Sequence, residues 1–260
     1  MRAAPWLVVA AGAAVGLLGG MIGLGGAEFR LPLLIGLFGF VALQAVILNK
    51  AMSLLVVLTA LPARLAAVPL SLLAPQWPVV VNLLAGTLVG AWAGASWAVR
   101  MRSSTLYRVL AGMLVLVAVA LSASHAGIVH PLDLPTAARV PAGVVAGLFI
   151  GVVAAVMGVA GGELLIPTIV LLYAVDIKAA GSLSLVVSLP TMLVAFARYS
   201  RDGSFAVLGE NRRFVVLMAS GSVFGTIVGG LTVGVVASSV LIPLLTALLL
   251  VSAWKVWGHR

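Results

Sequence analysis

Long apolar runs that are interrupted by very few charges constrain this chain more than any other feature of its sequence. Of its 260 residues, 63% are hydrophobic and 8% are charged, whereas about 25% of the residues in an ordinary soluble protein are charged. So few charged side chains cannot cover a water-exposed surface of this size, and in lipid a helix satisfies its own backbone hydrogen bonds. The sequence therefore predicts an all-α polytopic membrane protein.

Few side chains are available for catalysis, metal binding or nucleic-acid binding. The chain contains no cysteine, and its three histidines lie in a predicted loop or at the last residues (His125, His130 and His259). It has no phosphate-binding loop of the Gly-x-x-x-x-Gly-Lys type. Its basic residues form no patch interleaved with aromatic residues, as nucleic-acid binding requires. We expect neither an enzyme nor a cofactor, a metal site or a nucleic-acid partner.

Two glycine-rich segments carry the same order of special residues. The run from Gly23 to Pro32 aligns without gaps, at one constant offset, with the run from Gly158 to Pro167. The identical pairs are Gly23/Gly158, Gly26/Gly161, Glu28/Glu163 and Pro32/Pro167. If the first copy carries two extra residues, Asn49 lies beside Ser182. The pattern predicts two repeats, 1–122 and 140–260, joined by an external linker over 123–139.

Each predicted repeat contains a segment that is too short to cross a bilayer. A spanning helix needs about 20 residues, whereas the second apolar segment of each repeat covers only about 29–42 or 163–175. In the first repeat, Gln44 and the Asn49-Lys50 pair are expected to interrupt it. We expect it to meet the preceding segment, about 5–24 or 140–158, in mid-membrane as a pair of half-helices. Three full spans then remain in each repeat, at about 47–68, 77–99, 105–122, 180–198, 212–236 and 238–256.

Basic residues predict the orientation of these spans. They cluster at Arg100, Arg102 and Arg108 and again at Arg198, Arg201, Arg212 and Arg213, and such clusters stay in the cytoplasm. An odd number of full spans then gives the second repeat the opposite topology and places both termini in the cytoplasm. Inverted repeats with broken helices near the midplane are typical of secondary transporters, whose substrate site lies between the repeats.

The two helix breaks are the predicted substrate site. Exposed backbone is tolerated at that depth only beside protein or water, and the start of a half-helix attracts an anion. The candidate substrate contacts are the backbone of the glycine pairs and three polar side chains that follow: Gly25, Gly26, Gly161, Gly162, Asn49, Lys50 and Ser182. The alternative is that the breaks are structural and that Asn49 and Ser182 are helix N-caps.

Three further charged residues in the membrane segments have two interpretations each. Glu28 and Glu163 carry protons for coupling, or they cap the half-helices that they begin. Arg30, whose counterpart is Leu165, either supplies a charge for the substrate or acts as a counter-ion for Glu28.

Glycines spaced four residues apart elsewhere predict close helix packing; they are Gly12, Gly16, Gly20, Gly86, Gly90, Gly94, Gly147, Gly151, Gly221, Gly225 and Gly229.

These motifs resemble the TauE/SafE sulfite exporter family. The resemblance rests on two Gly-Gly-x-Glu segments or close variants, each followed by a Pro-led apolar helix and then by an Asn-Lys or Gly-Ser-Leu stretch, and it covers both halves. The chain departs from the family's longer glycine run at Leu24 and Ala160. The resemblance implies a bacterial inner-membrane permease for small sulfur-containing anions such as sulfite or organosulfonates.

The expected function is therefore secondary transport of a small anion by alternating access. The expected partners are the anion, the lipid bilayer and a coupling ion, either a proton or sodium, and a homodimer is compatible with the sequence. An anion channel and a proton-coupled carrier of another small organic solute are the alternatives.

Overall fold

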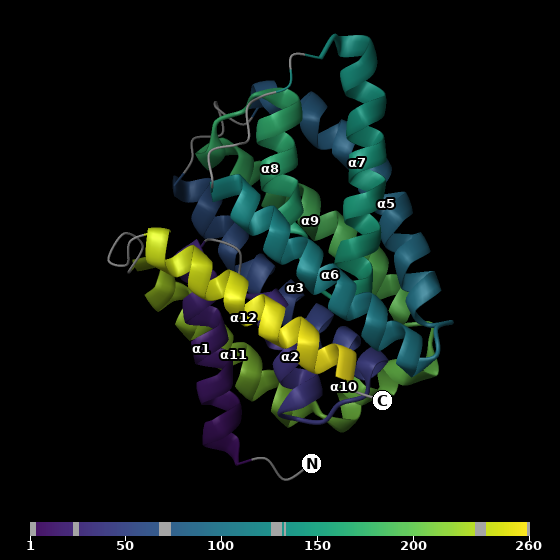
Figure 1. Cartoon of the computed structure of the whole chain (residues 1–260), viewed down its shortest axis with the longest axis vertical. Coiled ribbons are helices and arrows are strands. Elements are labelled where there is room, and N and C mark those ends of the chain that lie inside the picture. The colour runs from purple at the N-terminus through teal and green to yellow at the C-terminus, as the bar shows by residue number, and fades with distance from the viewer. Residues whose placement is uncertain are drawn as a thin grey trace.

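The computed structural model describes residues 4–22, 26–67, 74–125, 132, 134–231 and 238–258, and in these residues the fold is all-helical (Figure 1). The first half contains α1 (Pro5–Ile22), α2 (Ala27–Gly36), α3 (Ala42–Ala67), α5 (Trp77–Ala98) and α6 (Ser103–His125). The second half contains α7 (Thr136–Met157), α8 (Gly162–Tyr173), α9 (Ile177–Tyr199), the short α10 (Val207–Glu210), α11 (Arg212–Leu231) and α12 (Ser238–Gly258). Short 3-10 turns cover Ala74–Gln76 and Gly203–Ala206.

Six of the described helices are long and apolar enough to cross a membrane, namely α3, α5, α6, α7, α9 and α11. The chain is thus a multi-pass membrane protein. Helices α2 and α8 have only 10 and 12 residues, fewer than the roughly 20 that a span needs, as predicted. The segment 140–158 was expected to be a half-helix, but α7 has 22 residues because it begins earlier, directly after Pro135.

Two full spans also begin earlier than expected. Helix α3 begins at Ala42 and α9 at Ile177, rather than near residues 47 and 180. The predicted interruption at Gln44 and the Asn49-Lys50 pair lies inside α3. Asn49 and Lys50 do not end the helix because their side chains are completely buried and donate to protein carbonyls.

The helices of the two halves share one numerical register. One residue offset, the one that separates Gly23 from Gly158, also separates the first residues of matching helices. The matching pairs are α2 and α8, α3 and α9, α5 and α11, and α6 and α12. The last residues of α1 and α7 differ by the same offset. The two extra residues assumed for the first copy are wrong, because the number of residues between Pro32 and the start of α3 equals the number between Pro167 and the start of α9. Asn49 therefore corresponds to Ser184, and Ser53 corresponds to Ser188.

Two helices of each half pack against the other half through glycines. Helix α1 lies along α11, and α5 lies along α7. A Cβ added at Gly16 would collide with the backbone of Ser222, and one at Gly225 with the carbonyl of Ala13. In the other pair, a Cβ at Gly90 would collide with the Leu148 carbonyl. The prediction that these glycine steps serve close packing is confirmed.

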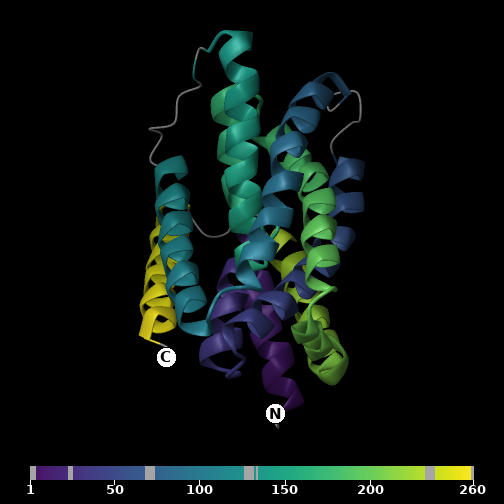
Figure 2. The ribbon, with the colours of Figure 1, turned by 90° about the vertical axis from the view of Figure 1, so that its right-hand side faces the viewer.

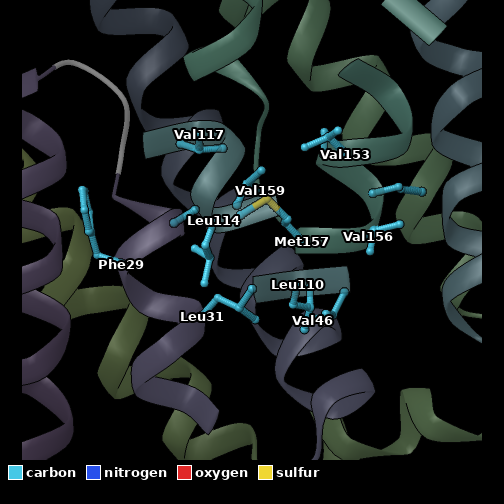
Figure 3. Packing of buried hydrophobic residues seen from close by; sticks show 14 of the residues in the cluster. Phe29, Leu31, Val46, Leu110, Leu114, Val117, Val153, Val156, Met157 and Val159 are labelled. Carbon is cyan, nitrogen blue, oxygen red and sulfur yellow. The ribbon is translucent and has the colours of Figure 1, made fainter. Parts of the chain in front are cut away.

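The first helices of the two halves run in opposite directions. Helix α1 starts in the lower part of both views, whereas α7 starts at the top and runs downward (Figures 1 and 2). Each ends in the interior, where a short helix follows. Around this region lies a hydrophobic core that includes Leu31 of α2, Val46 of α3, Leu110 of α6 and Met157 of α7 (Figure 3). The core fixes the helix ends that form the candidate site.

Candidate functional site

The first helix break places a left-handed glycine at the start of α2. Gly26 has φ 71°, a conformation that favours glycine, and a Cβ there would collide with the carbonyl of Val15 in α1. Gly26 is therefore required by local geometry whether or not a substrate approaches it. Gly25, the neighbouring candidate contact, lies outside the described residues.

The second break contains two left-handed glycines. Gly158, with φ 72°, ends α7, and Gly161, with φ 87°, precedes Gly162, the first residue of α8. A Cβ on Gly158 would collide with the carbonyl of Val46, so α3 of the first half passes directly against this break. The break in one half is thus shaped by a helix from the other half.

Arg30 is completely buried in α2. Its Nη1 donates to Asn49 Oδ1 at 3.4 Å and to Ser53 Oγ at 3.3 Å. Its Nε and Nη2 have no hydrogen-bond partner in the described structure. Both carboxylate oxygens of Glu28 also lack a partner among the described residues, so no hydrogen bond joins Glu28 to Arg30, and both interpretations of Arg30 stay predictions.

Asn49 uses its whole side-chain amide to join three segments. Its Nδ2 donates to the carbonyl of Ala27 at 3.0 Å and to that of Met157 at 3.2 Å, while its Oδ1 accepts from Arg30. Because α3 begins at Ala42, Asn49 is not an N-cap; Ser182, which is buried within α9, is not one either. Asn49 instead ties the start of α2 to the end of α7 and orients Arg30.

Lys50 is completely buried and reaches the second break from α3. Its Nζ donates to the carbonyls of Ala154 at 2.8 Å and Val159 at 2.7 Å. The hydroxyl of Tyr199 in α9 donates to the carbonyl of Ala155 at 3.0 Å. The last carbonyls of a helix lack partners within it and carry partial negative charge. The carbonyls of Ala154 and Ala155 also accept from the backbone N–H groups of Val159 and Gly158, both at 3.1 Å. Lys50 and Tyr199 are therefore additional donors at the end of α7.

The two glutamates occupy matching positions but differ in their contacts. Glu28 is 1% exposed and Glu163 is 6% exposed. Since neither oxygen of Glu28 accepts a hydrogen bond from a described residue, the capping interpretation is wrong for this residue. The carboxyl of Glu163 is hydrogen-bonded to its own backbone, and only its Oε1 lacks a partner in the described part of the chain. This contact is compatible with capping by Glu163, for which that role stays a prediction.

Two residues of this site, Ser53 and Tyr199, were not among the site residues predicted from the sequence. Ser53 lies four residues after Asn49, which places both on one face of α3, and this spacing was a usable signal for their shared contact with Arg30. Tyr199 lies at the far end of α9, 44 residues from the carbonyl it binds, and no sequence pattern points to that contact. Ser188, the counterpart of Ser53, is buried, and its Oγ lacks a partner among the described residues.

Comparison with protein families matches the chain to the sulfite exporter TauE/SafE family over residues 1–121 and 135–260. The chain belongs to this family. Searches of curated proteins and of solved structures each returned no match. TauE/SafE proteins are membrane transporters and not enzymes, as the sequence predicted.

The matched residues also agree with the helical layout. The stretch between the two TauE/SafE matches, residues 122–134, falls between the halves and lies within or beside the predicted linker. Both helix breaks and both half-helices lie inside the matched segments. The described residues of the candidate site thus lie within the segments that match the family.

Proposed function

We propose that this TauE/SafE protein is a secondary transporter of small sulfur-containing anions and that Arg30 receives the anion. The unpartnered edge of the buried Arg30 guanidinium, as seen in the described residues, is the observation that carries the proposal. A cation buried away from water is costly unless it is paired. Nε and Nη2 form the edge of a guanidinium whose N–H groups point in parallel, and this fork matches two oxygens of a sulfite or sulfonate group.

The neighbouring residues hold this fork in place. Asn49 and Ser53 bind the opposite side of the guanidinium through Nη1 and leave the fork to the anion. The start of α2 adds backbone amides and a positive dipole end beside Gly26. On this proposal the second half contributes one wall of the site, which consists of Gly161, Gly162 and Ser182. Lys50 affects the anion through its electric field, since its ammonium is bound to two carbonyls.

The proposed mechanism is alternating access between two inverted repeats, 1–122 and 140–260. It is supported by the constant offset between matching helices, by the reciprocal pairs α1–α11 and α5–α7, and by the opposite courses of α1 and α7. The start of α1, α10 and the end of α12 lie toward one end of the molecule (Figure 1). We assign this end to the cytoplasm of a bacterial inner membrane because basic residues accumulate near it.

Transport by purified protein in lipid vesicles tests this function. We expect uptake of radiolabelled sulfite to saturate and to show counterflow when the vesicles are preloaded with unlabelled sulfite. Arg30→Gln should lower the uptake rate at least a hundredfold, because it removes the cationic fork that receives the anion. Leu165→Gln, the same final residue at the matching position, is the control and should keep most of the rate. Uptake that is linear in concentration and lacks counterflow would indicate a channel.

Cysteine labelling tests the topology in this cysteine-free chain. Ser103→Cys and Ser204→Cys should be protected from an impermeant thiol reagent in intact cells, and Ser124→Cys, at the other end of α6, should react. Labelling in the reverse order, with normal transport by all three variants, would reject the assigned orientation.

A further inference from the structure

The first half-helix carries two oppositely charged groups that are buried and incompletely paired. Glu28 and Arg30 lie two residues apart on α2 and are 1% and 0% exposed. Within the described structure, neither oxygen of Glu28 has a hydrogen-bond partner, and neither do Nε and Nη2 of Arg30. Hydrocarbon and packed protein solvate ions poorly. A net charge at this position therefore strongly opposes the conformational change that exposes the site first to one side of the membrane and then to the other.

Other charged groups near Glu28 are few in the described residues. Helix α2 packs against α1, α3 and α12. The described part of α1 carries no ionisable side chain, and on the described part of α12 only Lys255 does, which is exposed near the end of that helix. On α3, Lys50 is held by carbonyls at the end of α7, and Arg64 lies far beyond it along the helix. Arg30 is thus the cation whose charge Glu28 can balance.

Charge balance at this helix gives two electrically neutral states. With the anion bound, the charges of Arg30, Glu28 and the anion sum to zero only if Glu28 is protonated. Without the anion, the charges of Arg30 and Glu28 sum to zero only if Glu28 is ionised. The two charges need not touch for this, because Coulomb interactions over a few ångströms are strong in a medium of low dielectric constant. Binding of the anion and binding of the proton then favour each other to the same extent.

We propose that Glu28 takes up one proton when one singly charged anion binds to Arg30 and releases it when the anion leaves. Transport is then electroneutral symport of a proton with the anion. The only bond made or broken is the carboxyl O–H of Glu28, whose proton comes from water on one side and returns to water on the other. Sulfite is carried as hydrogensulfite. This inference rests on the proposed function and names its coupling ion.

The second half supplies a matched control. Glu163 occupies the position that corresponds to Glu28, but Leu165 replaces Arg30 there, and the Glu163 carboxyl is hydrogen-bonded to its own backbone. With no buried cation two residues away, ionisation of Glu163 is not required when the anion leaves. Glu28 is therefore the coupling residue and Glu163 is not.

The test measures sulfite accumulation in vesicles under an imposed pH gradient, acidic outside, with the membrane potential clamped at zero. We expect wild-type protein and Glu163→Gln to accumulate sulfite against its gradient. Glu28→Gln should accumulate about tenfold less while its counterflow at uniform pH stays within about twofold of wild type. Glu28→Asp, which keeps the carboxyl, should restore accumulation. The Glu163→Gln vesicles experience the same sulfite speciation and the same leak, so they correct for both.

The outcomes separate the two proposals. Counterflow in the wild type without accumulation driven by the pH gradient, or full accumulation by Glu28→Gln, would overturn proton coupling and leave anion transport standing. An absence of saturable sulfite counterflow in the wild type would reject the proposed function and this inference with it. If Glu28→Gln does not fold, accumulation by the wild type and by Glu28→Asp decides the question in the same way.

Discussion

The two helix breaks share one backbone design but differ in their polar side chains. Each has a left-handed glycine before a half-helix, a glutamate at the second position and a proline four residues later. In the first half Arg30, Asn49 and Lys50 surround this scaffold, whereas the corresponding residues of the second half are Leu165, Ser184 and Leu185. The two halves share this framework, whereas the charged side chains around it belong to the first half.

Contacts across the breaks are equally one-sided. Asn49 and Lys50 leave their own half and bind carbonyls at the end of α7. Ser184, which corresponds to Asn49, donates to the carbonyl of Gly181 in its own helix, and Leu185 has no polar group to donate. Helix α3 therefore stabilises the second break through its hydrogen bonds, whereas Arg30 on α2 supplies the charged group at the first break. Three pairs of substitutions at matched positions test this division of roles.

The largest effect is expected from alanine at the glycines that begin the half-helices. Gly26→Ala should lower the free energy of unfolding by about 3 kcal/mol, because left-handed strain adds to a collision with the Val15 carbonyl. Gly161→Ala should cost about half as much, because its Cβ would meet only the side chains of Ala154 at 3.1 Å and Ile150 at 3.4 Å. Unfolding of both variants by SDS in mixed micelles measures the difference. Equal losses would show that the two breaks are equally constrained.

A smaller effect is expected from Lys50→Met. The change removes the ammonium donor from the carbonyls of Ala154 and Val159, of which Ala154 keeps the backbone N–H of Val159, while it also removes the cost of burying an ammonium group. We expect a net loss of about 2 kcal/mol in the free energy of unfolding. Leu185→Met, the matched control, should change it by less than about 1 kcal/mol.

Sulfite affinity distinguishes this bracing role from the substrate role that the sequence predicted for Lys50. In Lys50→Met protein that remains folded, the affinity should change by no more than a few-fold. A hundredfold loss of affinity with unchanged stability would instead make Lys50 a direct ligand of the anion.

The smallest effect is expected from truncation of the residue that orients Arg30. Asn49→Ala removes one of the two groups that hold Nη1, so sulfite affinity should fall about tenfold, equivalent to about 1.4 kcal/mol. Ser184→Ala removes only a bond within its own helix and should leave affinity unchanged within about twofold. Isothermal titration of the detergent-solubilised proteins with sulfite provides both values. A larger loss for Ser184→Ala would place the anion in the second half.

Much of the architecture could be predicted because it depends on local composition. The membrane class follows from the scarcity of charge, the short α2 and α8 from the length of two apolar runs, and the glycine contacts from a spacing of four residues. The offset between the two glycine motifs also held for the helix starts. Helix starts were less accurate, since Gln44 was interpreted as a breaker although it lies inside α3.

The sequence by itself determined that this is a helical membrane protein of the TauE/SafE family with two similar breaks. Only the tertiary structure decided which groups meet there: that Lys50 binds carbonyls of the other half, that Asn49 orients Arg30, and that Glu28 is left without a partner among the described residues. Periodicity and composition specify the face of a helix, whereas a side-chain hydrogen bond depends on which other helix lies against that face. In this protein that choice comes from the packing of one half into the other.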